Sequence, residues 1–328
     1  MVTRWGIIGT GGIAAKFATD LRLLPDAEVV AVGSRSRQTA DAFADTFDVT
    51  RRHPSYQGLV EDPDVDVVYV STPHPGHFPA AALAIESGKA VLCEKPFTLN
   101  AGEAAELVAA ARRRGVFLME AMWTRFLPHM VRIRELLAAG ALGDVRTVQA
   151  DHGQWFRHDP AHRLLAPGLG GGALLDLGVY PVSFASMVLG PPTRVTAVSA
   201  AASTGVDAQT SMLLEHADGR HAVLTTTLQA RSPNRAAIVG TEARIEVDAT
   251  WYAPTTFTLV SRDGTILQRY DEAHPGGGLR HQAAEVGHCL AEGQLESPVM
   301  PLDESVAVMS TLDEVRRQIG LVYPSERR

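Results

Sequence analysis

A glycine motif close to the start of the chain constrains the fold more than any other feature of the sequence. Residues Gly9 to Ala14 read G-T-G-G-I-A, which fits the pattern G-x-G-x-x-G/A. They follow a strand expected at Arg4 to Ile8 and open a predicted helix, and this context is what makes the short pattern specific. Gly9 permits a tight turn, Gly11 allows a pyrophosphate to approach the backbone, and Ala14 lets the helix pack closely on the strand. An ordinary glycine-rich turn is the alternative, but the motif in this context predicts a Rossmann fold that binds a dinucleotide.

The pattern up to about Met122 is typical of a parallel sheet with crossover helices, because short apolar runs alternate with helical stretches. One helix is expected to begin at a capping box formed by Asn100 and Glu103 and to end at Gly115. The strands are expected at Arg4 to Ile8, Glu28 to Val32, Val65 to Ser71, Ala90 to Cys93 and Phe117 to Glu120.

Past Trp123 the pattern changes to strands without regular helices between them, which indicates an antiparallel sheet. After a helix near 129–139, strands are expected at 145–154, 194–200, 209–215, 221–228, 236–239, 244–247 and 256–260. The predicted fold class is therefore α/β followed by α+β: a doubly wound parallel sheet, then a domain with a large, mostly antiparallel, open-faced sheet. We assign the first domain to 1–123 and the second to 124–328, with a last helix at 302–320 that can pack back on the first domain.

Composition argues against several function classes. Of the 328 residues, 45% are hydrophobic and 20% are charged, as in an ordinary globular protein. We find no segment that predicts a membrane span or a targeting signal, so a cytoplasmic location is expected. The two cysteines, Cys93 and Cys289, are too few for a disulfide framework or a cysteine metal site. The net charge of -7, with interspersed signs, argues against a nucleic-acid partner.

The loop after the second strand favours NADP over NAD. NAD-binding proteins usually carry an acidic residue about twenty residues past the glycines, where it binds the ribose hydroxyls. Here the loop carries Ser34, Arg35 and Arg37 and no carboxylate. A carboxylate would repel the 2′-phosphate of NADP, whereas hydroxyl and guanidinium groups bind a phosphate through charge-assisted hydrogen bonds. NAD remains the alternative, with these residues as a solvated loop.

Two segments follow the third and fourth expected strands, at the edge of a doubly wound sheet where ligands bind. They are Ser71 to His77 and Cys93 to Phe97, and the second contains Glu94-Lys95-Pro96. A later segment, Asp176 to Tyr180, reads D-L-G-V-Y. Together with the glycine motif, these elements resemble the glucose-fructose oxidoreductase / inositol dehydrogenase (Gfo/Idh/MocA) family over essentially the whole chain.

The resemblance is strongest to one branch of that family. Many members carry histidine where this chain has Tyr180, whereas the branch of dimeric dihydrodiol dehydrogenases, NADP-dependent xylose dehydrogenase and glucose-fructose oxidoreductase carries tyrosine. The segments Met119 to Phe126 and Asp159 to Leu164 are also similar to this branch. The resemblance implies an NADP-dependent enzyme that acts on sugars or dihydrodiols.

The chemistry implied by the family needs a proton-transferring group beside the substrate oxygen. An alcohol loses its hydroxyl proton while hydride leaves its carbon for the nicotinamide. The resemblance implies that Lys95 orients this oxygen, that Tyr180 exchanges the proton, and that Asp176 binds a substrate hydroxyl. An ammonium beside Tyr180 would lower the pKa of its phenol toward neutrality. The alternatives are a solvated lysine and a core tyrosine bonded to backbone.

The candidate binding residues come from these segments and from the aromatic residues near them, which can also be ordinary core. The expected cofactor residues are Gly9, Thr10, Gly11, Gly12, Ile13, Ser34, Arg35, Arg37, Ser71, Thr72, Pro73, His74, His77, Glu94, Lys95, Trp123 and Arg163. The expected substrate residues are Lys95, Trp123, Arg125, Phe126, Phe156, Asp176 and Tyr180. No metal site is expected, because Pro160 interrupts the pair His158 and His162 and no carboxylate cluster completes a zinc site.

These residues predict an NADP-dependent oxidoreductase that transfers hydride between nicotinamide and a secondary alcohol or ketone of a sugar, cyclic polyol or trans-dihydrodiol. One alternative is a sugar-nucleotide ketoreductase. Another is a non-catalytic NADP-binding sensor, although such a module has no need of Lys95, Asp176 and Tyr180 together. An open-faced sheet in the second domain would expose apolar residues, so a homodimer through that sheet is expected.

Overall fold

The computed structural model describes residues 2–272 and 275–326, and the chain divides into two compact units. The first unit comprises Met1–Trp123 and Pro275–Val306, and the second comprises Thr124–His274 and Ala307–Arg328. Residues 275–306 therefore belong to the first unit, whereas the sequence pattern places them in the second domain. Buried Asp20 gives one physical reason, because its carboxylate accepts the backbone N–H groups of Gly277 and Arg280.

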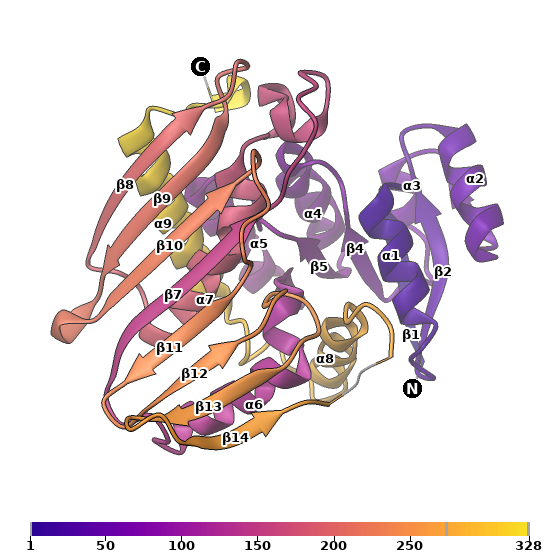
Figure 1. The fold of residues 1–328 in the computed structure, drawn as a ribbon. Coiled ribbons are helices and arrows are strands. Elements are labelled where there is room, and N and C mark those ends of the chain that lie inside the picture. The colour runs from indigo at the N-terminus through magenta and orange to yellow at the C-terminus, as the bar shows by residue number, and fades with distance from the viewer. Residues whose placement is uncertain (1, 273–274, 327–328) are drawn as a thin grey trace. The chain divides into compact units, whose positions relative to one another are not determined.

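The first unit contains a six-stranded sheet in which all neighbouring strands are parallel, which confirms the predicted doubly wound arrangement (Figure 1). Its order is β3-β2-β1-β4-β5-β6. The strands are β1 (Thr3–Ile8), β2 (Ala27–Gly33), β3 (Arg51–His53), β4 (Val67–Val70), β5 (Ala90–Glu94) and β6 (Leu118–Ala121). The helices are α1 (Gly12–Leu21), α2 (Arg37–Phe47), α3 (Tyr56–Val60), α4 (His77–Glu86), α5 (Ala101–Arg114) and α8 (Arg280–Ala291).

Side-chain caps explain where two of these helices begin. Ser36 accepts the N–H of Thr39 at the start of α2. At α5, Asn100 accepts the N–H of Glu103 at 2.9 Å, while the Glu103 carboxylate accepts the N–H of Leu99 at 3.0 Å. Asn100 thus caps α5 as expected, and Glu103 reaches back to the backbone just before the helix. Helix α8 has no side-chain cap at Leu279, so no capping residue in the sequence marks its start. The sequence pattern does not predict this helix.

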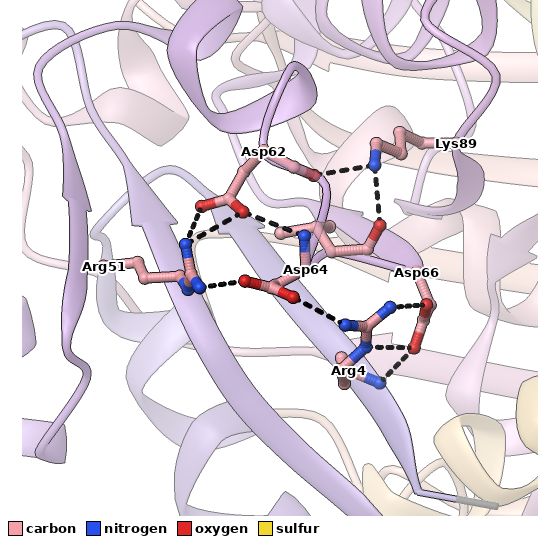
Figure 2. Close-up of polar contacts among 7 residues, drawn as sticks. Arg4, Arg51, Asp62, Asp64, Asp66 and Lys89 are labelled. Carbon is pink, nitrogen blue, oxygen red and sulfur yellow. Dashed lines mark hydrogen bonds and ion pairs between the residues drawn. The ribbon is translucent and has the colours of Figure 1, made fainter.

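At the amino-terminal ends of the parallel strands, six charged residues form a network that we call the amino-edge cluster. Figure 2 shows its members: Arg4, Arg51, Asp62, Asp64, Asp66 and Lys89. Arg4 pairs with Asp64 at 2.9 Å and with Asp66 at 2.7 Å. Arg51 pairs with Asp62 at 3.3 Å and also with Asp64. The ammonium of Lys89 donates to the carbonyls of Asp62 and Val65 at 2.7 and 2.8 Å, so each cation of the cluster has protein partners.

The second unit contains an eight-stranded sheet of order β14-β13-β12-β11-β7-β10-β9-β8. Only β7 and β10 pair in parallel within it, which confirms the expected mostly antiparallel sheet. The strands are β7 (Val145–Gly153), β8 (Arg194–Ala201), β9 (Asp207–Glu215), β10 (His221–Thr227), β11 (Ala236–Gly240), β12 (Ala243–Val247), β13 (Phe257–Ser261) and β14 (Ile266–Tyr270). The helices are α6 (Pro128–Ala138) and α7 (Val179–Leu189), and α9 (Leu302–Ile319) begins in the first unit and ends in the second.

Short helical turns connect several of these elements. They are η1 (His74–Gly76), η2 (Trp123–Phe126), η3 (Arg163–Leu165), η4 (Pro167–Leu169), η5 (Leu174–Gly178), η6 (Ala217–Gly219) and η7 (Pro324–Glu326). Of these, η5 is a π turn that runs directly into α7.

One segment of the second unit is as apolar as a membrane span, although no such segment is expected from the sequence. Pro167–Leu189 is long and apolar enough to cross a membrane by composition alone. However, 89% of its apolar window is buried inside the protein, as expected for a core helix. This segment packs on the sheet and carries both Asp176 and Tyr180, so the apolar core of the unit also positions the predicted substrate residues.

Candidate active site

The glycine motif lies where β1 ends and α1 begins. Gly9 has a φ of +98°, and a Cβ atom on it would stand 2.9 Å from the carbonyl oxygen of Ser71, so a side chain would be strained and crowded. Gly11 and Gly12 have no described atom within 4 Å of an added Cβ. No side chain caps α1. The turn, which also includes Thr10 and Ile13, therefore offers free backbone N–H groups and open space that fit a pyrophosphate.

The loop after β2 separates three side chains that the sequence groups together. Ser34 is buried, with its hydroxyl 2.6 Å from the hydroxyl of Thr39. Arg37 forms an ion pair with Asp41 at 3.3 Å. Arg35 is exposed, and its guanidinium makes no hydrogen bond or ion pair within residues 2–272 and 275–326. Arg35 is therefore the arginine of this loop that the protein itself leaves available.

His77 joins the segments that follow β4 and β5. Its Nδ1 lies 2.8 Å from the carbonyl oxygen of Pro96, and its Nε2 lies 2.8 Å from that of Thr72. Burial is the main cause that lowers the pKa of His77 to about 3. The ring is therefore neutral near pH 7 and donates to one of the two carbonyls at a time. His77 thus ties the predicted cofactor segment of Ser71, Thr72, Pro73 and His74 to the carbonyl of Pro96, the residue that follows Lys95.

Two buried carboxylates hold the backbone around Lys95, which follows β5 directly and is half-buried. The Glu94 carboxylate accepts the hydroxyl of Tyr69 at 2.6 Å and the N–H of Lys95 at 3.2 Å. On the neighbouring strand β6, Glu120 accepts the N–H of Phe97 at 3.1 Å. The Glu-Lys-Pro element is therefore fixed from both sides. Trp123, the last residue of this part of the first unit, is half-buried.

In the second unit, the π turn η5 presents Asp176. The side chain of Asp176 is 7% exposed, and Arg163 donates to it at 2.9 Å. Arg163 is an expected cofactor residue, and the structure shows its guanidinium bound to Asp176. The turn begins at Leu174, whose N–H donates to Asp207 at 2.8 Å. Burial is the main cause that raises the pKa of Asp207 to about 7, against hydrogen bonds that lower it.

Tyr180 is buried at the start of α7 and packs against two rings that no sequence motif indicates. The ring of His152 lies 5.1 Å from that of Tyr180, edge-on, and the ring of Tyr252 lies 5.3 Å away. His152 and Tyr252 stack at 3.7 Å. The amide nitrogen of Gln154 lies 2.9 Å from His152 Nε2 and donates to the Tyr252 hydroxyl at 3.2 Å. We call Tyr180, His152, Gln154 and Tyr252 the Tyr180 cluster.

Sequence reasoning missed three members of this cluster because they come from separate elements. His152 lies on β7, and Tyr252 lies in the loop between β12 and β13. The available signal is the period-two burial along β7, where Val148, Ala150 and His152 all face the core. That pattern places His152 inside the protein but does not name its neighbours.

The other expected substrate residues occupy varied surroundings. Arg125 is 3% exposed and donates to the hydroxyl of Ser183 at 3.0 Å and to its carbonyl at 2.7 Å, so it links η2 to α7. Phe126 is buried, and Phe156 is half-buried with its ring 5.8 Å from that of His162. The engaged guanidinium of Arg125 makes it a structural link in this unit.

Among residues 2–272 and 275–326, no group of three or more histidine, cysteine, aspartate or glutamate side chains is placed to hold a metal ion. Cys93 and Cys289 are both buried free thiols. Burial is the main cause that raises the pKa of Cys289 to about 12, so this thiol stays protonated near pH 7.

The chain matches two family models. The model described as an oxidoreductase family with an NAD-binding Rossmann fold matches residues 3–122. The model of the GFO/IDH/MocA C-terminal domain matches residues 130–246. Each of the two predicted domains thus has a counterpart in the same family.

Similar proteins include enzymes that align with this chain over its whole length. The chain is 40% identical over 336 residues to trans-1,2-dihydrobenzene-1,2-diol dehydrogenase of Mus musculus, covering 100% of both chains. It is 38% identical over 336 residues to the enzyme of the same name from Homo sapiens, again covering 100% of both.

Solved structures extend the similarity. An aldose-aldose oxidoreductase from Caulobacter crescentus, complexed with glycerol, aligns with a TM-score of 0.88 at 26% identity, covering 97% of each chain. A 3-ketoreductase from Actinomadura kijaniata, in complex with NADP and TDP-benzene, aligns with a TM-score of 0.83 at 27% identity, covering 97% of this chain and 98% of the other. The protein therefore belongs to the Gfo/Idh/MocA family of NAD(P)-binding oxidoreductases, which act on CH–OH groups.

Proposed function

We propose that this protein transfers hydride between NADP(H) and a secondary alcohol or ketone of a sugar, cyclic polyol or trans-dihydrodiol. The observation that carries the proposal is the full-length similarity to a dihydrodiol dehydrogenase, in a chain that contains Lys95, Asp176 and Tyr180. The similar aldose-aldose oxidoreductase supports a carbohydrate as the substrate class.

Arg35 supports NADP as the cofactor. It is exposed after β2, in a loop without a carboxylate, and within the described residues it has no polar partner. A guanidinium in this position suits the 2′-phosphate that distinguishes NADP from NAD. The similar 3-ketoreductase was solved with NADP. The pyrophosphate would be held by the N–H groups at Gly11 and Gly12, where the space is open.

We assign the chemistry to three side chains of this chain. The bound cofactor supplies or accepts the hydride. Tyr180 gives a proton to the substrate oxygen during reduction and takes it back during oxidation, while the Lys95 ammonium stabilises the charge on that oxygen. Asp176, which Arg163 orients, accepts a hydrogen bond from a neighbouring substrate hydroxyl. The buried surroundings of Tyr180 and Asp176 exclude bulk water from this step.

A sugar-nucleotide ketoreductase is the second candidate, because the similar 3-ketoreductase was solved with TDP-benzene. A diphosphate-linked substrate would need cations beside the substrate residues. Arg157, which follows β7, and Arg163, which begins η3, are both exposed, and Arg163 already contacts Asp176. A non-catalytic NADP sensor is the third candidate, and it would bind cofactor without turnover.

We also propose a homodimer that acts in the cytoplasm. The strands β8, β9 and β10 expose Val198, Leu213 and Val223, with fractional exposures of 68%, 40% and 48%. Leu213 and Val223 are paired across β9 and β10, so they form a contiguous apolar surface that a second copy could cover. Sedimentation of the protein as a monomer at micromolar concentration would contradict this assignment.

A substrate panel tests the proposal. The protein would be incubated with NADP+ or NAD+ and with pentoses, hexoses, inositols, a trans-dihydrodiol of benzene and a nucleoside diphosphate sugar, and NAD(P)H formation would be followed by absorbance. We expect turnover with NADP+ and a free sugar, polyol or dihydrodiol. Turnover confined to the nucleotide sugar supports the ketoreductase, and tight NADPH binding without turnover on any substrate supports the sensor.

A further inference from the structure

Asp176 and Tyr180 sit on an irregular piece of helix. Leu174–Gly178 forms the π turn η5, and α7 follows from Val179. Pro181 gives the physical reason, because proline has no backbone N–H and its ring crowds the carbonyl four residues earlier. That carbonyl belongs to Leu177, between Asp176 and Tyr180. The Leu177 carbonyl therefore lacks the donor that a regular α-helix would provide.

His152 supplies a hydrogen bond to this carbonyl from another element. Its Nδ1 lies 3.2 Å from the Leu177 oxygen, and its side chain is buried. A carbonyl oxygen only accepts, so Nδ1 carries a proton in this bond. The N–H of Val179 also reaches the same oxygen, which can accept two hydrogen bonds.

The other ring nitrogen fixes the orientation of His152. Nε2 lies 2.9 Å from the amide nitrogen of Gln154, which is a donor in this arrangement, so Nε2 accepts. The ring stacks on Tyr252 at 3.7 Å and meets the ring of Tyr180 edge-on at 5.1 Å. His152 is thus held by two hydrogen bonds and a stack, and it contacts both the turn before Tyr180 and the Tyr180 ring itself.

We infer that His152 is a positioning residue that replaces the donor removed by Pro181 and thereby sets the placement of Asp176 and Tyr180. It transfers no proton to substrate, because both of its nitrogens bind protein groups. This inference rests on the proposed function, in which Asp176 and Tyr180 act on the substrate. Misplacement of a reacting group by about 1 Å can lower a rate roughly 100-fold, so loss of this bond should be visible in kcat.

Two substitutions separate the hydrogen bond from the ring. His152→Phe keeps an aromatic ring against Tyr252 and Tyr180 but removes the donor to Leu177. His152→Asn removes the ring, while its side-chain amide can place an N–H near the position of Nδ1. We expect His152→Phe to lower kcat roughly 10- to 100-fold with KM and NADPH affinity little changed, and His152→Asn to recover most of kcat.

A third substitution tests the link to proline directly. Pro181→Ala restores a backbone N–H four residues after Leu177. If the inference holds, His152→Phe costs much less kcat in the Pro181→Ala background than in the wild type, which a double-mutant cycle measures. Matching Tm values, taken for all four proteins, show that kcat is compared between folded enzymes. If His152→Phe alone does not fold, the Asn variant and the double variant provide the comparison.

The outcomes are distinguishable. Wild-type kcat in His152→Phe, or the same loss of kcat with and without Pro181, would overturn the inference while leaving the proposed function in place. A larger loss of kcat in the Asn variant, which lacks the ring, than in the Phe variant, which keeps it, would assign the ring a packing role and also overturn the inference. A wild-type protein that binds NADPH but turns over no alcohol or ketone would overturn the proposed function, and the inference with it.

Discussion

Lys89 and Lys95 stand just before and just after the same strand, β5, and their surroundings differ. Lys89 donates to two backbone carbonyls, those of Asp62 and Val65, inside the amino-edge cluster. Lys95 belongs to an element whose backbone is held by the buried carboxylates Glu94 and Glu120. The Lys89 side chain therefore stabilises the fold at the amino edge. At the carboxyl edge, other side chains hold the backbone around Lys95.

The arginines of the two edges show the same difference. Arg4 and Arg51 each pair with two aspartates of the amino-edge cluster, as Figure 2 shows. Arg35, after the carboxyl end of β2, has no polar partner in the described part of the chain. Charges that the protein satisfies by itself contribute to folding, and a charge that it leaves open is available to a ligand.

The largest expected effect comes from the two lysines. Lys95→Met should lower kcat by about 10² to 10⁴, the usual contribution of a group that assists proton transfer, with NADPH affinity and Tm close to the wild type. Lys89→Met should keep kcat and lower the free energy of unfolding by about 1–3 kcal/mol, because two carbonyls lose a charged donor. Steady-state kinetics and thermal unfolding of both variants provide the measurement. Near-normal turnover in Lys95→Met would remove Lys95 from the reaction.

Two aspartates, Asp66 in the amino-edge cluster and Asp207 beside the turn that carries Asp176, have pKa values shifted in opposite directions. The Arg4 hydrogen bond lowers the pKa of Asp66, whereas burial raises the pKa of Asp207 to about 7. The contribution of Asp66 is thus present at neutral pH and is lost as the pH falls through its lowered pKa. The contribution of Asp207 is present below its unfolded pKa of about 3.9 and is lost as the pH rises toward 7.

Denaturant titrations at several pH values test these opposite pH dependences of the stability contributions of Asp66 and Asp207. Between pH 5 and pH 8, the wild type should lose on the order of 2 kcal/mol of stability relative to Asp207→Asn. Asp66→Asn should lose stability relative to the wild type at pH 7, and this difference should shrink in acid. A stability difference between the wild type and Asp207→Asn that stays constant with pH would contradict the raised pKa.

The smallest expected effect concerns the exposed arginine. Arg35→Ala should weaken NADPH binding roughly tenfold, which corresponds to loss of one charged hydrogen bond of about 1.5 kcal/mol, and should leave NADH binding unchanged. Arg51→Ala, the matched change at the amino edge, should leave the affinities for both cofactors unchanged. Fluorescence titration of the wild type and both variants with NADPH and NADH measures the six dissociation constants. Equal weakening of NADPH and NADH by Arg35→Ala would contradict a contact with the 2′-phosphate.

The sequence predicts the parallel sheet well because each main strand is an apolar run and because one glycine motif specifies the first turn. It misses β3, whose three residues Arg51–His53 form a short edge strand without an apolar run. It assigns 275–306 to the second domain, whereas these residues cluster with the first unit, where the hydrogen bond between Asp20 and the backbone of Gly277 joins residues that are distant in sequence. Long-range contacts of this kind leave no local pattern.

In the candidate site, too, the sequence predicts the residues that lie in local motifs and misses those brought in by long-range contacts. Motifs indicate Lys95, Asp176 and Tyr180, because each lies in a short segment with a recognisable order of residues. The surroundings that orient them come from elsewhere: His152 from β7, Tyr252 from the loop after β12, and Asp207 from β9. Pro181 is visible in the sequence, but its effect on the Leu177 carbonyl becomes clear only when the donor from His152 is seen.

An isotope experiment can follow the proposed transfer of hydride between a secondary alcohol and NADP atom by atom. A sugar, polyol or dihydrodiol substrate identified by the panel would carry deuterium on the carbinol carbon, and the reduced cofactor would be analysed by mass spectrometry after incubation with NADP+. We expect deuterium on the nicotinamide ring with the wild type and very little with Lys95→Met. Reduced cofactor without deuterium, or bound NADP+ with no reduction by any alcohol in the panel, would contradict the proposed transfer.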